Sequence, residues 1–246
     1  MKKEKNFIIS IDQGTTSSRA ILFNLKGQTV YSSQKEFTQY FPKSGWVEHD
    51  PEEIWSTTKK TLKDVIKKSK KIKGNILTIG ITNQRETTVL WDKKTGKVVY
   101  NAIVWQDRRQ EEFCKNLRKQ NKETLIFNRT GLLIDSYFSG TKIKWVLDNV
   151  PLAKKLMEKK QLLFGTIDSF LIWRLTHGKV HATDATNASR TMIYNITNNK
   201  WDDTILKMLK IDKSILPTVK DCADDYGTTH PSITEKPISI SGVVGD

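Results

Sequence analysis

Polar residues that could bind a phosphate group gather in one short segment near the N-terminus. Residues 12–19 place a carboxylate, a glycine, four hydroxyl side chains and an arginine between two apolar runs. A glycine lets main-chain N–H groups approach an anion, and a carboxylate at a strand end can hold Mg²⁺ through water. The same composition is typical of a hairpin with local side-chain hydrogen bonds, so both interpretations stay open. Neither common nucleotide loop, G-x-x-x-x-G-K-[ST] or G-x-G-x-x-G, occurs in the sequence.

A second polar segment, residues 83–87, follows an apolar run and contains the adjacent charges Arg85 and Glu86. On a surface, such a pair would contribute little to stability. In a cleft, the same pair would bind vicinal hydroxyl groups, because arginine donates hydrogen bonds and glutamate accepts them. Spacing alone does not decide between these two interpretations.

Two aromatic residues stand in comparable positions. Trp105 precedes the polar residues 106–109, and Tyr137 lies within the polar segment 135–140. An aromatic ring can cover the C–H face of a polyol, although tryptophans at strand ends belong more often to the core. Taken singly, each of these segments is a weak indication of a binding site.

Histidine and cysteine give no indication of a metal site. His177 and His181 have the i, i+4 spacing of a zinc pair, but Gly178 is predicted to end the helix between them. Cys114 and Cys222 fit neither a disulfide framework nor a metal motif. The longest apolar runs have the length of strands and no signal peptide is predicted, so we expect a cytoplasmic protein without stable membrane insertion.

The net charge of +14 is the one feature of the composition that suggests a nucleic-acid or lipid partner. Only 8 of the 41 basic residues are arginines, whose forked head is preferred for reading bases and phosphates. The densest run, residues 67–73, follows a helical pattern without interleaved aromatic residues. These features favour a solvated basic surface, and we expect no nucleic-acid partner.

Strands and helices must hold these segments in place. Residues 7–11, 19–23 and 29–37 predict a three-stranded meander whose first turn is the 12–17 segment. A helix is predicted to begin at Asp50, because a capping residue, a proline and two acidic residues precede an apolar stripe. Further strands are predicted at 76–81, 87–91 and 98–105, so that the segments starting at Asn83 and Trp105 lie at strand ends.

The later part of the chain is predicted to be mainly helical, with Gly178 at a helix C-cap. The helical ranges are 108–119, 142–149, 152–159, 168–175 and 202–210. Together with the meander they indicate a mixed α/β fold rather than a Rossmann alternation. Residues 238–246 form a strand pattern that runs into a Gly-Asp turn, and we expect a further domain to follow it.

The polar segments, taken in order, resemble the motifs of a known family. They are DQGTTSSR, GWVEHDP, GITNQRET, NAIVWQDRR, TGLLID-YFSGTK, LLFGT-D, TDATNASRT and ISG--GD. These segments are similar, in the same order, to those of glycerol kinases in the FGGY family of carbohydrate kinases. The similarity extends from Phe7 to Asp246, whereas xylulose kinases have a G-Q-M-H-G type sequence in place of residues 83–87.

The resemblance implies a fold and an activity. The implied fold is the RNase-H-like α/β domain of the actin/hexokinase/Hsp70 superfold, with residues 1–246 forming the N-terminal kinase domain and a C-terminal domain absent from the chain. The implied reaction is the ATP-dependent phosphorylation of glycerol to sn-glycerol 3-phosphate in glycerol catabolism. ATP and Mg²⁺ are the implied cofactors, glycerol and ATP/ADP the implied partners, and the full-length protein is implied to be a homo-oligomer.

The resemblance also assigns roles to individual residues. Asp246 is implied to be the general base that takes the proton of the attacking hydroxyl, and Asp12 is implied to organise Mg²⁺ through water. The implied glycerol-binding residues are Arg85, Glu86, Trp105, Tyr137 and Asp246. The implied ATP-binding residues are Asp12, Thr15, Thr16, Ser17 and Arg19.

The sequence departs from the family pattern at two places. Ser136 stands where the family often has proline, and we expect only a slight loosening of the turn before Tyr137. Residues 231–236 lack the G-G-x-x-R-like loop through which some bacterial members bind fructose 1,6-bisphosphate. A second hypothesis is a catalytically incomplete fragment that acts only as a binding or interaction domain. The retained site residues do not separate this hypothesis from that of an enzyme.

Overall fold

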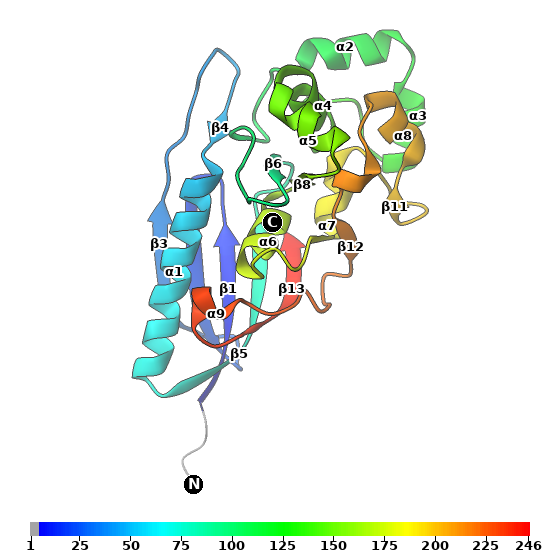
Figure 1. Ribbon diagram of the computed structural model, residues 1–246. Coiled ribbons are helices and arrows are strands. Elements are labelled where there is room, and N and C mark those ends of the chain that lie inside the picture. The colour runs from blue at the N-terminus through cyan, green and yellow to red at the C-terminus, as the bar shows by residue number, and fades with distance from the viewer. Residues whose placement is uncertain (1–4) are drawn as a thin grey trace.

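A five-stranded mixed sheet forms one half of the molecule (Figure 1). The structure is a computed structural model that describes residues 5–246. The strand order is β13-β5-β1-β2-β3. The bounds are β1 Lys5–Gln13, β2 Ser17–Asn24, β3 Thr29–Glu36, β5 Gly74–Asn83 and β13 Ser239–Gly245. The first three strands pair antiparallel, as the meander prediction required, while β5 runs parallel to β1 and β13 parallel to β5.

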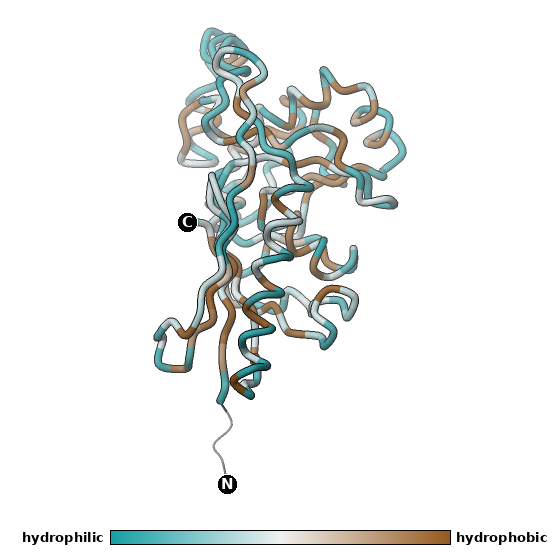
Figure 2. The backbone as a smooth tube through the Cα atoms, turned by 90° about the vertical axis from the view of Figure 1, so that its left-hand side faces the viewer, coloured by the Kyte–Doolittle hydropathy of each residue, from teal (hydrophilic) through white to brown (hydrophobic). Residues whose placement is uncertain are grey.

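Helices pack on one face of this sheet (Figures 1 and 2). The long helix α1 (Pro51–Lys71) begins as predicted, because the Asp50 carboxylate accepts a hydrogen bond of 2.8 Å from the Glu52 N–H group. Its buried residues join a core with alternate residues of β1 and with α6 (Ile167–Leu175) and α9 (Pro231–Thr234). Figure 2 shows the hydrophobic positions along the strands beside the mixed pattern of α1.

The helical half of the molecule lies beyond one end of the sheet and has its own core (Figure 1). Its helices are α2 Glu111–Lys119, α3 Glu123–Thr130, α4 Ser139–Asn149, α5 Pro151–Glu158, α7 Ala185–Ala188 and α8 Asp203–Leu209, with 3₁₀ turns at Ser189–Thr191 and Lys213–Ile215. The chain also forms four short strand pairs. They are β4 Glu48–His49 with β7 Ala102–Ile103, β6 Val89–Asp92 with β8 Leu162–Gly165, β9 Ala182–Asp184 with β12 Thr218–Lys220, and β10 Tyr194–Asn195 with β11 Lys200–Trp201.

The predicted strand at 98–105 was too long. Only Ala102–Ile103 forms β7, and Val98 contributes an isolated bridge to Trp91. The partner strand β4 has only two residues, so the ladder ends there, and the neighbouring Tyr100 and Asn101 side chains donate to the Glu48 carboxylate at 2.7 Å and 2.9 Å. The prediction also missed α3 and β8, and it began the α4 helix three residues late.

The end of α6 differs in detail from the prediction. The helix ends at Leu175 with Thr176 as its C-cap, and His177 occupies the left-handed position at φ +54. Gly178 follows at φ +81, and its N–H group donates to the Trp173 carbonyl at 2.8 Å, which completes a Schellman-type ending. The two histidines face different partners, since the His177 ring stacks on His230 and His181 bonds to the Phe164 carbonyl.

Within residues 5–246, no cluster of three or more His, Cys, Asp or Glu side chains could hold a metal ion. In the same range, none of the helices combines the length and the apolar character that a membrane span needs.

Candidate active site

A small cavity of about 150 Å³ lies where the sheet meets the helical half. Its lining residues are Thr15, Gln84, Arg85, Glu86, Trp105, Tyr137 and Asp246. The parallel strands β1, β5 and β13 end at the same edge of the sheet, so the segments that follow them meet there. All five predicted glycerol-binding residues therefore share one cavity, together with one predicted phosphate-binding residue. A larger hollow of about 490 Å³ beside α1 and α6 contains none of them.

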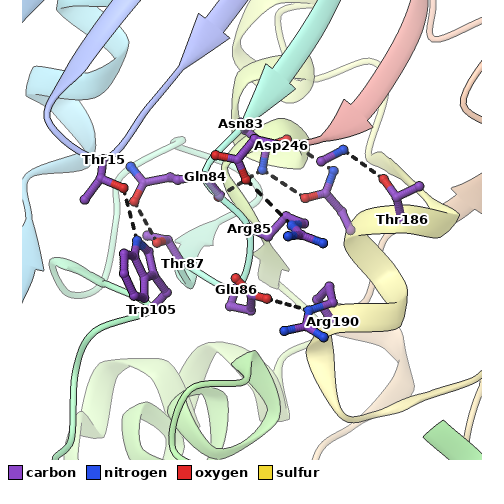
Figure 3. A network of polar contacts seen from close by, with 12 residues as sticks. Thr15, Asn83, Gln84, Arg85, Glu86, Thr87, Trp105, Thr186, Arg190 and Asp246 are labelled. Atoms are coloured by element: carbon purple, nitrogen blue, oxygen red, sulfur yellow. Dashed lines mark hydrogen bonds and ion pairs between the residues drawn. The ribbon is translucent and has the colours of Figure 1, made fainter. Parts of the chain in front are cut away.

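A tight turn after β5 aims two side chains into this cavity (Figure 3). Glu86 has φ +60, and the Thr87 N–H group donates to the Arg85 carbonyl at 2.7 Å. A three-residue turn with a positive φ at its centre is a γ-turn of the rare, strained kind. Such a conformation persists only where the surroundings hold it, and it occurs most often at functional sites.

The Glu86 carboxylate is buried and paired. It is 2% exposed, and its Oε1 atom lies 2.7 Å from Nε of Arg190. Burial raises the pKa of Glu86, while Arg190, Lys142 and Arg85 act in the opposite direction. Arg190 is a residue of the site that sequence reasoning missed, although it stands in the quoted TDATNASRT segment.

Arg85 faces Asp246 across the cavity. Its Nε atom lies 3.6 Å from Oδ1 of Asp246, which is too long for a hydrogen bond, and it has no other partner within residues 5–246. Gly245 permits this approach, because a Cβ atom at that position would lie 2.4 Å from Cδ of Arg85. The main chain is anchored nearby, since Gly245 N–H donates to Oγ1 of Thr186 at 2.8 Å and Asp246 N–H to the Asn83 carbonyl at 3.2 Å.

Two aromatic rings form the apolar wall of the cavity. The ring centroids of Trp105 and Tyr137 are 5.5 Å apart, and the planes meet at 55°. The Trp105 indole donates to Oγ1 of Thr15 at 3.0 Å, which links this wall to the β1–β2 hairpin. Burial raises the pKa of Tyr137, so its phenol remains protonated and can donate a hydrogen bond.

Gln84 joins the two polar segments, and sequence reasoning gave it no role. Its Nε2 atom donates to the Gly14 carbonyl at 3.0 Å and to Oε1 of Gln13 at 3.1 Å. Its Oε1 atom accepts from the Thr87 hydroxyl at 2.9 Å. The hairpin after β1 and the turn after β5 are therefore held in one network (Figure 3). An amide directly before an Arg-Glu pair at a strand end was the available signal.

The β1–β2 hairpin places its predicted phosphate-binding residues unequally. Asp12 and Arg19 form a long ion pair of 3.9 Å in which both side chains are partly exposed, and Thr16 is exposed. The Ser17 side chain is buried, and its hydroxyl accepts from Gln34 at 2.9 Å, so it is less available than the others. The donors suit a phosphate, and the single accessible carboxylate of Asp12 suits a magnesium ion that keeps most of its waters.

The chain is similar to known kinases throughout. Residues 7–246 match the family model described as the N-terminal domain of the FGGY family of carbohydrate kinases. A glycerol kinase of Rhizobium meliloti is 56% identical over 240 residues, which are 98% of this chain and 48% of that protein. A glycerol kinase of Alkaliphilus oremlandii is 57% identical over 243 residues, again 98% of this chain and 48% of the relative.

Solved structures agree with this match. The crystal structure of Plasmodium falciparum glycerol kinase with ADP superposes with a TM-score of 0.95 at 36% identity and covers 99% of this chain and 49% of that one. A gluconate kinase of Lactobacillus acidophilus, at 24% identity, shares the fold with a TM-score of 0.87. This alignment covers 99% of this chain and 48% of the gluconate kinase. The mixed sheet and its helices thus have the fold predicted from the sequence. The chain spans about half the length of the curated relatives it matches. On these grounds, the chain belongs to the FGGY family of carbohydrate kinases.

Proposed function

We propose that this chain is the acceptor-binding half of an enzyme that transfers the γ-phosphoryl group of ATP to glycerol and forms sn-glycerol 3-phosphate. The observation that carries the proposal is the cavity lined by Arg85, Glu86, Trp105, Tyr137 and Asp246. At about 150 Å³ it is well below the 300 Å³ or more of sites for drug-sized ligands, so it suits a three-carbon polyol. The glycerol kinases among the relatives favour the same substrate.

In this proposal each cavity residue contacts a different part of glycerol. Arg85 presents an unused Nε–H donor, and the Glu86 carboxylate accepts from a hydroxyl group on the other side. The Tyr137 phenol donates to a third hydroxyl, and the Trp105 ring covers the carbon face. Burial strengthens each of these contacts, because few waters compete within so small a space.

Asp246 is the proposed general base. It reaches the cavity from the end of β13 and faces Arg85, where it can take the proton of the terminal hydroxyl as that oxygen attacks the γ-phosphorus in line. Phosphoryl transfer depends mainly on positioning and charge neutralisation, so a short set of groups is sufficient.

The β1–β2 hairpin is the proposed phosphate site. Thr15, Thr16, Ser17 and Arg19 would contact the ATP phosphates, and Asp12 would hold Mg²⁺ through water. When bound, Mg²⁺ neutralises charge on the phosphates. The hydrogen bond from Trp105 to Thr15 sets the distance between this hairpin and the glycerol wall.

A second domain is proposed to supply the adenine site and to close over both substrates. The relatives are about twice as long as this chain, and their additional length could form such a domain. The fragment hypothesis, in which the chain only binds a ligand or partner, remains the alternative. The homo-oligomeric state and the cytoplasmic location also stay predictions.

A complementation assay tests the proposal. The chain is mixed with a separately produced C-terminal half of a glycerol kinase, and ADP release is followed with glycerol or xylulose as acceptor. We expect ADP release that depends on glycerol, on Mg²⁺ and on both halves, and little release with xylulose. Binding of glycerol without turnover in any mixture would favour the fragment hypothesis, and equal turnover of both acceptors would contradict the assigned substrate.

A further inference from the structure

Lys142, in the first turn of α4, is a buried cation next to the cavity. The residue is 1% exposed. Its Nζ atom donates to the Tyr137 carbonyl at 2.6 Å and to the Glu86 carbonyl at 3.2 Å. Both acceptors belong to the main chain of residues whose side chains line the cavity, and they come from segments far apart in the sequence.

The burial of an ammonium group needs a compensating gain. Removing such a group from water is unfavourable even after relaxation of the protein, and an apolar side chain of similar length would avoid that cost. Lys142 obtains hydrogen bonds to carbonyl dipoles, which neutralise a charge only in part. Its place in the first turn of a helix, where the macrodipole disfavours cations, adds to the cost.

We attribute the compensating stabilisation to the strained turn at Glu86, which Lys142 helps to hold. The Glu86 carbonyl that Lys142 binds also accepts a hydrogen bond of 3.0 Å from the Ser139 hydroxyl. Two side chains of one helix turn therefore hold the carbonyl of the residue at φ +60. The ammonium holds the main chain before α4 at the same time. Nζ of Lys142 is thus bonded to the carbonyls of both Glu86 and Tyr137, and the Ser139 hydroxyl supports the Glu86 side of this link.

We propose that Lys142 is a positioning residue that holds the Glu86 turn against the Tyr137 segment, and that its charge makes acceptor affinity dependent on pH. The claim that acceptor affinity depends on pH rests on the proposed function, because it takes glycerol as the ligand. The claim that Lys142 positions the main chain is independent of the ligand.

The charged groups around Lys142 define the pH range. Burial lowers the pKa of Lys142 to about 7, opposed by the carboxylates of Glu86, Asp107 and Asp135, while the Arg109 guanidinium lowers it further. Below that pH the ammonium holds both carbonyls. Above it the neutral amine donates more weakly, and acceptor affinity should fall.

Folding stability should follow the opposite trend. The pKa of Lys142 is depressed from 10.5 to about 7, so between these values the unfolded chain binds a proton that the folded chain does not. The contribution of Lys142 to the free energy of unfolding therefore increases as the pH rises from about 7 to about 10.5. Opposite trends in affinity and stability would distinguish a positioning cation from an ordinary buried residue.

The first test observes the main chain without a ligand. The ¹⁵Nζ signal of Lys142 and the amide signals of Glu86, Thr87 and Tyr137 are followed by NMR through pH 5.5–9 in the intact chain. We expect one shared midpoint near 7, which Lys142→Met removes and the control Lys144→Met leaves in place. Lys144 lies on the same helix and pairs with Asp148. Amide signals that do not move with Lys142 in the wild-type chain would overturn the proposal, whether or not the variant folds.

The second test measures glycerol affinity by calorimetry at pH 6 and pH 8.5. We expect the wild-type dissociation constant to rise severalfold with pH, that of Lys142→Met to be at least tenfold higher at pH 6 and nearly independent of pH, and that of Lys144→Met to match the wild type. A Lys142→Met variant with wild-type affinity and pH profile would overturn the proposal. If the wild-type chain binds no glycerol, the proposed substrate fails, and the NMR titration alone decides the positioning role.

Discussion

Arg85 shows at the scale of a single residue how this site differs from an ordinary surface ion pair. Its sequence neighbour Glu86 does not pair with it and binds Arg190 instead. Arg85 faces Asp246 at 3.6 Å, with its Nε atom buried and unused within residues 5–246. A buried donor without a partner carries a desolvation penalty, which a bound hydroxyl group would remove.

Arg85→Ala should therefore abolish the recognition of glycerol while the fold remains intact. The loss of a hydrogen bond from a charged donor costs about 1.5–3 kcal/mol, which corresponds to at least tenfold in the dissociation constant measured by calorimetry. Arg118→Ala, which removes an arginine paired with Glu111 on α2, is the matched control and should bind normally. Unchanged glycerol affinity in a folded Arg85→Ala variant would refute the assignment.

Asp12→Asn should leave glycerol binding unchanged and remove Mg²⁺-dependent turnover. The amide keeps the shape of the side chain but lacks the anionic charge that magnesium requires. The measurement compares glycerol binding with ADP release in the complemented two-domain enzyme. Normal turnover in this variant would mean that the hairpin has only a structural role.

The family motifs in the sequence could identify the residues that line the cavity but not the residues that hold them in place. Arg85, Glu86, Trp105 and Asp246 follow strand ends, and Tyr137 lies just before α4; these positions bring the five residues into one cavity. Lys142 binds two main-chain carbonyls, Arg190 binds the Glu86 carboxylate, and Gln84 binds the Gln13–Gly14 segment of the β1–β2 hairpin. Such contacts leave no spacing pattern, because their partners come from distant segments.

Among the helices and strands, those with local sequence signals were predictable and those that depend on a distant partner were not. The start of α1 was predictable because its cap, proline and acidic first turn are local signals. The strand β4 was not predictable and β7 was predicted too long, because a two-residue segment has no periodicity and exists only through its partner. The length of β7 is limited by its two-residue partner β4, and this pairing is a tertiary contact.

A cluster around Arg109 fixes the loops that carry Trp105. The guanidinium carbon lies 3.8 Å from the ring centroid of Trp46 and 4.5 Å from that of Trp145, and the side chain is 1% exposed. Arg109 also pairs with Glu48 at 2.7 Å and with Asp107 at 2.8 Å. This arrangement links the loop before β4 to the loop after β7.

Arg109→Leu should destabilise the chain by about 3–5 kcal/mol, because it leaves two buried carboxylates without a cation. Denaturant unfolding measures the difference in the free energy of unfolding. Arg108→Ala is the matched control, since the neighbouring Arg108 pairs with Asp135 at a side-chain exposure of 53% and should contribute less than about 1 kcal/mol. A loss of less than 1 kcal/mol in Arg109→Leu would show that the cluster is not a structural anchor.

At the scale of the whole molecule, the cavity is open to solvent on the side of Asp246. Asp246 has a side-chain exposure of 56%, and Thr16 at the tip of the β1–β2 hairpin is also exposed. Catalysis of this kind relies on a second wall that excludes water and aligns the γ-phosphorus with the bound hydroxyl.

The 246-residue chain on its own should therefore fold and yet turn over no ATP. A coupled ADP assay on the homogeneous chain, with circular dichroism as the check on folding, measures this. Glycerol-dependent ADP release by the chain alone would contradict the need for a second domain. Activity that appears only when the C-terminal half is added would support it.

The position of β13 has a consequence for the order of folding. β13 pairs with β5 in parallel, and Gly245 lies opposite Asn83, although the whole helical half of the chain lies between them. Contacts between residues so far apart in sequence form slowly, because a long loop must close first. During synthesis the hairpin, the Glu86 turn and the aromatic wall leave the ribosome well before Asp246. We expect the acceptor cavity to stay incomplete until β13 joins β5, because Asp246 is the last of its lining residues to be synthesised.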